Sequence, residues 1–277
     1  MRLFKSTVRF PGSYIHNATT RNGTAGSPWT RVRDAEDKHV FLQWNRDTPT
    51  YIYSTNARSL LSGEPDSWVG YGAGFGGARA VFPGDHDIVY GLTRVSSSSF
   101  VLRRSNDRGT THAVLADIGW GGILSSDAFY AVLAIHPTDP AIFFTASSTG
   151  DLARFDGNAG TWRTGYDLRG LHKAAYPDAA SPAVYSVALD PQDANVGYVG
   201  IESYGSHGIW RSGNIQAASP DWEDISAYFH RINTGPKLVV HPLTGDVFAG
   251  TGGVGLRVLP APGRRSHPSL IGNWTTL

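Results

Sequence analysis

Short apolar runs separated by polar turns fill residues 184–225. The runs VYSVAL, VGYVGI, GIWRS and WEDI are rich in β-branched and aromatic residues, and the segments DPQDAN, ESYGSH and SGNIQAASPD separate them. Short runs of this composition, bounded by turn residues, predict β-strands joined as antiparallel hairpins. A single sheet of such strands cannot bury both of its apolar faces, so we expect neighbouring units of the same kind.

The same pattern recurs along the chain. In each repeat a Pro or Trp follows a strand, and an aromatic residue comes six or seven positions later, after a polar turn. These pairs are Trp44 with Tyr51, Pro83 with Tyr90, Pro137 with Phe144, Pro191 with Tyr198, and Pro242 with Phe248. A second aromatic, usually Trp, opens the last strand of each unit: Trp29, Trp68, His112, Trp162, Trp222 and Trp274. Successive pairs begin 39 to 54 residues apart, the length of a four-stranded propeller blade.

We therefore expect an all-β fold, a single β-propeller of four-stranded antiparallel blades over residues 1–277. The expected blades cover about residues 1–35, 36–72, 78–117, 130–168, 183–226 and 236–277. Six outer-strand markers against five inner pairs make the first unit short or irregular, with SYIHNATT and PWTRV as its third and fourth strands. Six blades are expected, and a seventh stays open.

Composition narrows the function classes. The formal net charge is +1 and no run of Lys or Arg occurs, which disfavours a broad basic surface for nucleic acid. The chain has no cysteine, so disulfides and thiolate metal sites are excluded. No apolar run reaches the roughly 18 residues of a membrane span, and no signal-peptide pattern is visible. Secretion and a cytoplasmic location both stay open, and we expect no metal and no cofactor.

One turn carries a specific signature. Residues 105–112, Ser-Asn-Asp-Arg-Gly-Thr-Thr-His, fit the pattern Ser-x-Asp-x-Gly-x-Thr-aromatic, with His112 where Trp is usual. In such a hairpin the Asp carboxylate accepts backbone and hydroxyl hydrogen bonds, and the Gly takes a left-handed conformation. We expect structural roles for four residues of this turn: Ser105, Asp107, Gly109 and Thr111. Weaker echoes lie at residues 20–29, 156–162 and 212–222.

This turn, together with phrases such as VALDPQDANVGYVGI and GIWRS, resembles the Asp-box (BNR-repeat) β-propellers: sialidases, family 74 glycoside hydrolases (xyloglucanases) and sortilin-type propellers. The resemblance covers about residues 80–277 and implies Asp-box hairpins on the face away from the ligand. Arg9-Phe10-Pro11 nearly matches the Arg-Ile-Pro of sialidases, but the other two arginines and the Tyr/Glu nucleophile pair have no matching motif. The Thr-Asp-x-Gly-Gly segment of xyloglucanases is missing, and so is the second propeller of their groove.

In a propeller, the loops from strand two to three and from strand four to the next blade lie on one face. Five segments are expected there: residues 69–77, 117–130, 167–185, 202–207 and 226–233. The side chains that we expect to bind a ligand are Trp120, Tyr130, Arg169, His172, Tyr176, Tyr204, His207, Tyr228, His230 and Arg231. Aromatic rings cover the C–H face of a sugar and charged groups bind its hydroxyls, so the expected partner is a glycan or polysaccharide. Aromatic residues in such loops can also fill the mouth of the propeller's central channel, and this structural role is the alternative to ligand binding.

The expected function is a carbohydrate-recognition propeller. A glycoside hydrolase or lyase that uses the same face stays open, with Glu202 and Asp127 as the expected catalytic carboxylates. A protein-interaction scaffold, whose rim aromatics bind a partner, is the third interpretation. The sequence indicates neither the ligand nor the oligomeric state.

Overall fold

The structure is a computed structural model of the chain. It describes residues 18–22, 29–34, 40–42, 51–54, 57–60, 69–75, 78–82, 85, 87–95, 100–118, 132–146, 150–204, 206–229, 235–241, 244–250 and 256–260. Contacts divide the chain into two compact units, one of residues 1–81, 85–94 and 101–115 and the other of residues 82–84, 95–100 and 116–277.

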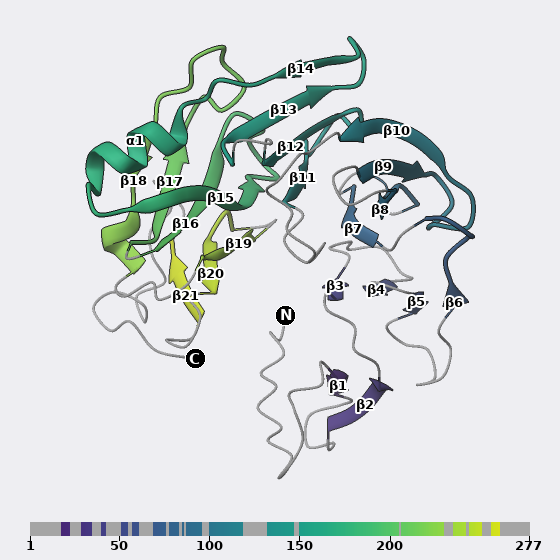
Figure 1. Ribbon diagram of the computed structural model, residues 1–277. Helices are drawn as coiled ribbons and strands as arrows, with labels where there is room; N and C mark the ends of the chain where they lie inside the picture. Colours follow the sequence, from purple (N-terminus) through teal and green to yellow (C-terminus); the bar gives the residue numbers. More distant parts are fainter. Residues whose placement is uncertain are drawn as a thin grey trace. The chain divides into compact units, whose positions relative to one another are not determined.

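The described residues form antiparallel sheets whose strands are consecutive in sequence (Figure 1). The first sheet contains β1 (Ala18–Asn22) and β2 (Trp29–Asp34). The second contains β3 (Val40–Leu42), β4 (Tyr51–Ser54), β5 (Ala57–Leu60) and β6 (Val69–Gly70). The third contains β7 (Ala78–Val81), β8 (Val89–Arg94), β9 (Phe100–Ser105) and β10 (Ala113–Ile118). The next contains β11 (Leu133–Ile135), β12 (Ile142–Ala146), β13 (Leu152–Asp156) and β14 (Thr161–Arg163). The last two contain β15 (Ala180–Leu189), β16 (Gly197–Tyr204), β17 (Gly208–Ser212) and β18 (Glu223–Asp224); and β19 (Lys237–Val240), β20 (Val247–Gly250) and β21 (Leu256–Leu259).

The prediction of an all-β propeller with four-stranded antiparallel blades is confirmed, but the described residues form four such blades and not the expected six or seven. Among the described residues, four sheets have four strands. Of the first expected blade the structure describes the two strands β1 and β2, and of the last it describes the three strands β19 to β21. The candidate earlier strand FKSTVRF and the Trp274 marker lie outside the described residues.

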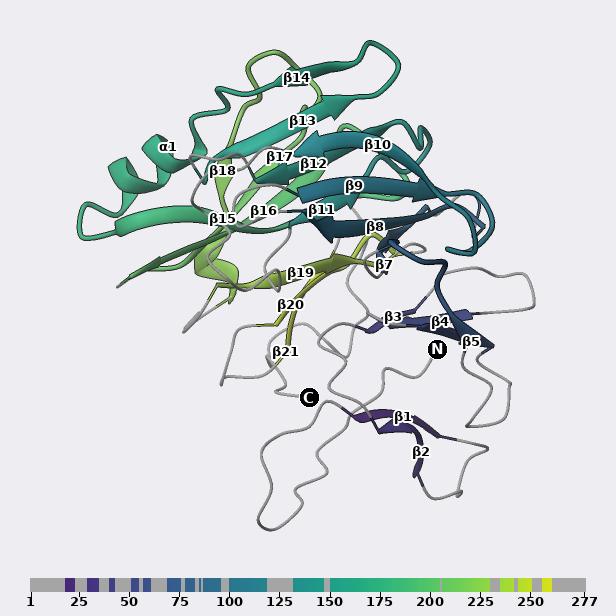
Figure 2. The same cartoon turned by 45° about the vertical axis from the view of Figure 1, so that its right-hand side comes forward.

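Packing in the second unit explains why the strands of residues 184–225 are apolar on both faces. Alternate residues of the β15–β18 sheet point to opposite sides. Val187 and Val199 join the core shared with Phe144 of the preceding sheet, whereas Tyr198 packs with Leu238 of the following sheet. Figure 2 shows β11–β14 and β15–β18 as neighbouring layers.

The aromatic residue of the repeated pattern is a core residue. Tyr90, Phe144 and Tyr198 each have an exposed fraction of 1% or less. Each lies in the second strand of its sheet, where strands on both sides cover it. The regular spacing of these aromatic residues therefore arises because each occupies the same buried position in its own blade.

One segment that we expected to be a loop contains a helix. Within residues 167–185, α1 (Leu168–Ala175) precedes β15, which begins at Ala180. Leu168 and His172 are one helical turn apart and are both buried, so they share the face that packs on the sheet. A second short helix, the 3₁₀ helix η2 (Ser226–Phe229), follows β18.

Candidate functional site

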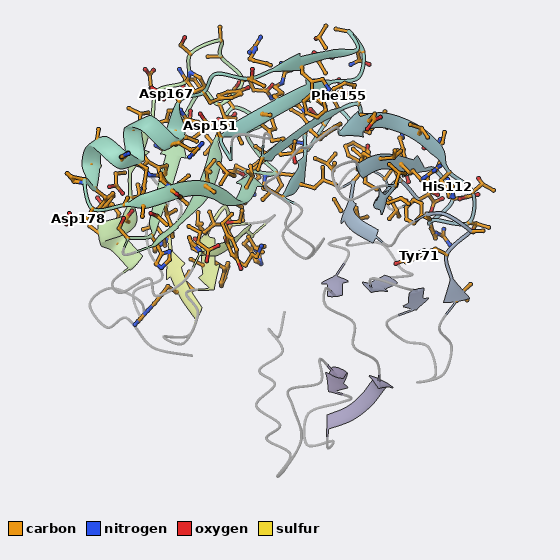
Figure 3. The ribbon with its side chains drawn as sticks, viewed as in Figure 1. Tyr71, His112, Asp151, Phe155, Asp167 and Asp178 are labelled. Carbon is orange, nitrogen blue, oxygen red and sulfur yellow. The ribbon has the colours of Figure 1, made fainter. Side chains whose placement is uncertain are left out.

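Three of the predicted ligand-facing segments meet at one edge of the β15–β18 sheet. Ala180, at the start of β15, pairs with Tyr204 at the end of β16, and Ile201 pairs with Gly208 at the start of β17. The α1 segment, residues 206 and 207, and η2 therefore share this edge, which we call the α1 edge. Figure 3 marks Asp167 and Asp178 on either side of α1.

Three contacts fix α1 to the sheets. At its N-terminal end, the Leu168 amide donates a hydrogen bond to Asp151 Oδ1 (3.1 Å). Asp151 thereby supplies the acceptor that the side chain of the N-cap residue, Asp167, does not supply. Burial raises the pKa of Asp151. Trp210 forms a hydrogen bond with His172 in the middle of the helix, and Asp224 forms one with Tyr176, the residue that follows the helix. The helix thus owes its position to residues of other elements.

The middle contact is a buried imidazole. His172 is fully buried, and Trp210 Nε1 donates a hydrogen bond to its Nδ1 (3.1 Å). Because Nδ1 accepts, the neutral ring carries its proton on Nε2, which faces Ser206 Oγ at 3.5 Å. Burial lowers the pKa of His172, against the opposing influence of Ser206 and the negative charge of Asp224, while His207 lowers it further. The surroundings therefore select the neutral imidazole.

The C-terminal contact is a hydrogen-bond chain. Tyr176 Oη donates to Asp224 Oδ2 (2.7 Å), and Asp224 Oδ1 accepts from the Ser226 amide (2.9 Å) and hydroxyl. The Ile209 amide in turn donates to Ser226 Oγ (2.9 Å). Burial raises the pKa of Tyr176, Ser226 opposes this, and Asp224 adds to it. The phenol therefore stays protonated and serves as a donor.

A lysine ammonium packs on a tyrosine where β19 lies beside the β15–β18 sheet. Lys237 Nζ donates to the Tyr185 carbonyl (3.2 Å) and lies 3.9 Å from the centre of the Tyr185 ring. The Lys237 side chain is exposed as a whole, yet protein atoms surround its ammonium closely enough to lower its pKa to about 8 by desolvation. The negative charge of Glu202 acts in the opposite direction. The charge of the exposed Glu202 carboxylate therefore acts on this ammonium.

The other described residues of the predicted site have mixed surroundings. Arg169 Nε donates to the Pro182 carbonyl (2.5 Å), so part of its guanidinium serves the local fold. His207 Nδ1 accepts from the Ser203 amide at 3.4 Å, and the Tyr228 side chain is 50% exposed. Tyr204 ends β16. The remaining predicted residues lie outside the described part of the chain: Trp120, Asp127, Tyr130, His230 and Arg231.

Sequence reasoning missed Tyr185, Lys237 and Asp151. Lys237 is the only charged residue of the run KLVV and opens an inner strand four residues after the end of an expected ligand-facing segment, which is a usable signal. Tyr185 and Asp151 gave no such signal, because their partners are distant in sequence. The spacing from Tyr185 to Lys237 is 52 residues.

The Ser105–His112 turn has the hydrogen bonds expected of it. Asp107 accepts from the Thr111 amide (2.7 Å), the Thr111 hydroxyl (2.6 Å) and the Ser105 hydroxyl (2.7 Å). Gly109 has φ +86°, and His112 packs on Phe75 with ring centres 5.5 Å apart. Figure 3 labels His112 and, below it, Tyr71, each of which packs on Phe75. Whether this turn belongs to the Asp-box repeat stays a prediction, because no family model matches.

A second turn uses an amide where this one uses a carboxylate. Asn214 Oδ1 accepts from the Ser212 hydroxyl (3.0 Å) and the Asp221 amide (2.8 Å). The Asn214 amide group then donates to Asp221 Oδ2 (3.0 Å). The echo predicted at residues 212–222 is therefore a side-chain-linked turn as well.

Replacing Asp107 by alanine is expected to lower the free energy of unfolding by about 2 kcal/mol, because charge-assisted hydrogen bonds are lost. Desolvation opposes ionisation of Asp107, but hydrogen bonds from Thr111, Ser105 and Thr110 outweigh it and lower the pKa to about 2. The stabilisation is therefore complete above the ordinary pKa of 3.8 and lost as pH falls toward 2. Urea unfolding measures both effects. Asn106→Ala, an exposed neighbour, is the control, and equal losses in the two variants would contradict the expectation.

Within the described residues, no group of three or more His, Cys, Asp or Glu side chains is arranged to hold a metal ion. No helix among them is long and apolar enough to cross a membrane.

Comparisons with known proteins identify the fold. No family model matches the chain, and no curated protein matches it. Among solved structures, the chain is similar to the GH74 enzyme of Niastella koreensis (TM-score 0.54, 13% identity, 80% of this chain and 35% of that one). It is also similar to an ancestral GH74 enzyme (0.54, 11%, 83% and 32%) and a putative TolB of Agrobacterium tumefaciens (0.53, 14%, 83% and 79%). The chain spans about a third of the length of the two GH74 enzymes. At these identities the similarity shows the β-propeller fold alone.

Proposed function

We propose that the chain binds carbohydrate at the α1 edge, with Glu202 and Lys237 as hydrogen-bonding partners of neighbouring sugar hydroxyls. The single observation that carries the proposal is that the negative charge of Glu202 raises the pKa of the Lys237 ammonium, which lies on a strand of the adjacent sheet. A carboxylate accepts and an ammonium donates, so the pair matches hydroxyls that do both. A charge pair of opposite sign also favours a neutral sugar over a strongly charged one.

Aromatic surface at the same edge supports this proposal. The Tyr228 ring is half exposed on η2, and an exposed aromatic ring suits the C–H face of a sugar. The predicted ligand residues Trp120, Tyr130, His230 and Arg231 belong to the same proposal. His172 and Tyr176 take positioning roles in it, because their polar atoms bind Trp210 and Asp224. Similarity to two GH74 enzymes agrees with a carbohydrate ligand.

A glycan array followed by titration calorimetry tests the proposal. Glu202→Gln and Lys237→Met are each expected to weaken binding of the best glycan by about tenfold or more, since each removes a charge-assisted hydrogen bond. Gln192→Ala, exposed in the turn at the opposite edge of the same sheet, is the control and should bind like the wild type. Absence of glycan binding, or equal affinity in all variants, would refute the proposal.

The same variants separate binding from hydrolysis. Release of reducing ends from a polysaccharide panel by the wild type, with loss of release but not of binding in Glu202→Gln, would identify an enzyme. Asp127 is then the expected second carboxylate, because glycosidases use two carboxyls on either side of the bond.

A further inference from the structure

The imidazole of His172 has no room to shift within its site. The residue is fully buried, and a Cβ built on Gly208 would lie 2.7 Å from its Cε1 and 2.9 Å from its Nδ1. The Tyr176 ring packs on it with ring centres 4.7 Å apart. Because the β17 backbone and an aromatic ring both contact the imidazole closely, a small movement of the ring cannot accommodate a change at either nitrogen.

Both ring nitrogens of His172 have fixed roles. An indole N–H can only donate, so the hydrogen bond from Trp210 Nε1 (3.1 Å) makes Nδ1 an acceptor. Nε2 then carries the proton of the neutral ring and faces Ser206 Oγ at 3.5 Å. A second proton has to enter at Nδ1, where it would point at the Trp210 N–H. Protonation therefore breaks the hydrogen bond to Trp210 and leaves a charge in a buried site, which is costly unless the ring leaves that site.

We propose that His172 is a pH-sensitive switch, in which protonation of the ring releases residues 172–176 from the β15–β18 sheet and opens the α1 edge while the sheet stays folded. The helix suits this role, since it has only eight residues and includes Gly170, and such a helix has little stability of its own. Leu168 is buried and its amide is bound to Asp151, so the first turn keeps its own contacts. The switch is a property of the fold and does not depend on glycan binding.

The groups around the ring determine the direction of the switch. Burial lowers the pKa of the imidazole, Asp224 of β18 opposes this, and His207 beside β17 adds to it. The Tyr176 phenol stays protonated throughout the acidic range, because burial raises its pKa. Burial also raises the pKa of Asp151, so protonation of this carboxyl favours the bound helix as pH falls. Release of the helix on acidification must therefore come from His172, which takes up a proton more readily once it is free.

Hydrogen–deuterium exchange of the intact protein tests the switch, with mass spectrometry between pH 7 and pH 5 and correction for the intrinsic effect of pH on exchange. A released histidine takes up its proton near the ordinary pKa of 6.5. From pH 6 to pH 5, the protection of residues 172–176 is therefore expected to fall by about tenfold, the limit for one coupled proton. The β17 amides, which pair with β16, should keep their protection.

Two variants separate this switch from other effects of acid. The side-chain oxygen of His172→Asn can accept from Trp210 but does not titrate, so the protection of residues 172–176 should no longer depend on pH. His207→Asn should retain a fall of protection but a smaller one, because a neighbouring positive charge that disfavours the charged ring has been removed.

Three results would overturn the inference. The first is protection of residues 172–176 that is independent of pH in the wild type, and the second is an equal fall in His172→Asn. The third is loss of protection in β17 at the same pH, which would mean that the whole sheet unfolds. No glycan is present in these measurements, so their outcome is independent of the glycan proposal.

Discussion

Replacing Gly200 by alanine is expected to destabilise the protein by about 3 kcal/mol. Gly200 lies in β16, where a Cβ would be 2.6 Å from the Pro236 carbonyl oxygen and 2.6 Å from Ser186 Oγ. A backbone oxygen cannot swing away as a flexible side chain does. Ser186 also donates a hydrogen bond to the same Pro236 carbonyl, so the added methyl group would separate the two sheets where that bond joins them.

Gly213→Ala is the matched control for this variant. Gly213 follows β17 in the same sheet, and a Cβ there would meet nothing within 4 Å. Neither glycine has a positive φ, so backbone strain does not separate the two substitutions. Thermal and urea unfolding should show a large loss for Gly200→Ala and a change within about 0.5 kcal/mol for Gly213→Ala. Equal stabilities would mean that the β16 and β19 sheets are not packed as described.

Replacing His172 by phenylalanine is expected to cost about 2 to 3 kcal/mol, because the buried Trp210 N–H loses its acceptor. The ring is kept, so the change chiefly removes the hydrogen bond that holds α1. His172→Asn should recover part of the loss, since its side-chain oxygen can accept the same proton. Leu171→Ala, a partly exposed position on the same helix, should have a much smaller effect. Urea unfolding measures all three variants.

The same histidine predicts a pH dependence. Burial lowers its pKa below the ordinary 6.5, so the unfolded chain binds a proton at a higher pH than the folded protein does. The stabilisation is complete above about pH 6.5 and declines as pH falls below it. Asp224, His207 and Tyr176 are the titratable groups around it, and only Asp224 favours the charged ring. The difference in stability between the wild type and His172→Asn should therefore shrink between pH 7 and pH 5, and a constant difference would contradict this.

Strand positions were predictable because each strand has a local signal in its own residues and in the turns beside it. VGYVGI and GIWRS combine β-branched and aromatic residues with turns on both sides, and β16 and β17 lie where expected. The strand ends were less predictable: β16 continues through Glu202 to Tyr204, which the sequence placed in a turn. The blade count depended on the chain ends, where the repeat pattern weakens.

The helix α1 escaped prediction for a physical reason. It is short and contains Gly170, and the residue before it, Asp167, has a left-handed backbone and gives no side-chain cap. Such a segment has little intrinsic helical stability. Its support comes from Asp151 and from Trp210, which is 38 residues from His172 in sequence. Contacts at that distance leave no periodic signal, and the same holds for the approach of Lys237 to Tyr185.

The consecutive order of strands in every described sheet has a consequence for how such a chain arises and folds. Each ladder of backbone hydrogen bonds closes between strands that are neighbours in sequence, and contacts of short sequence separation favour fast folding. Duplication or deletion of one whole unit in a gene would leave the strand pairing of every other unit intact. Mutations would then have to restore only the side-chain packing between one blade and the next.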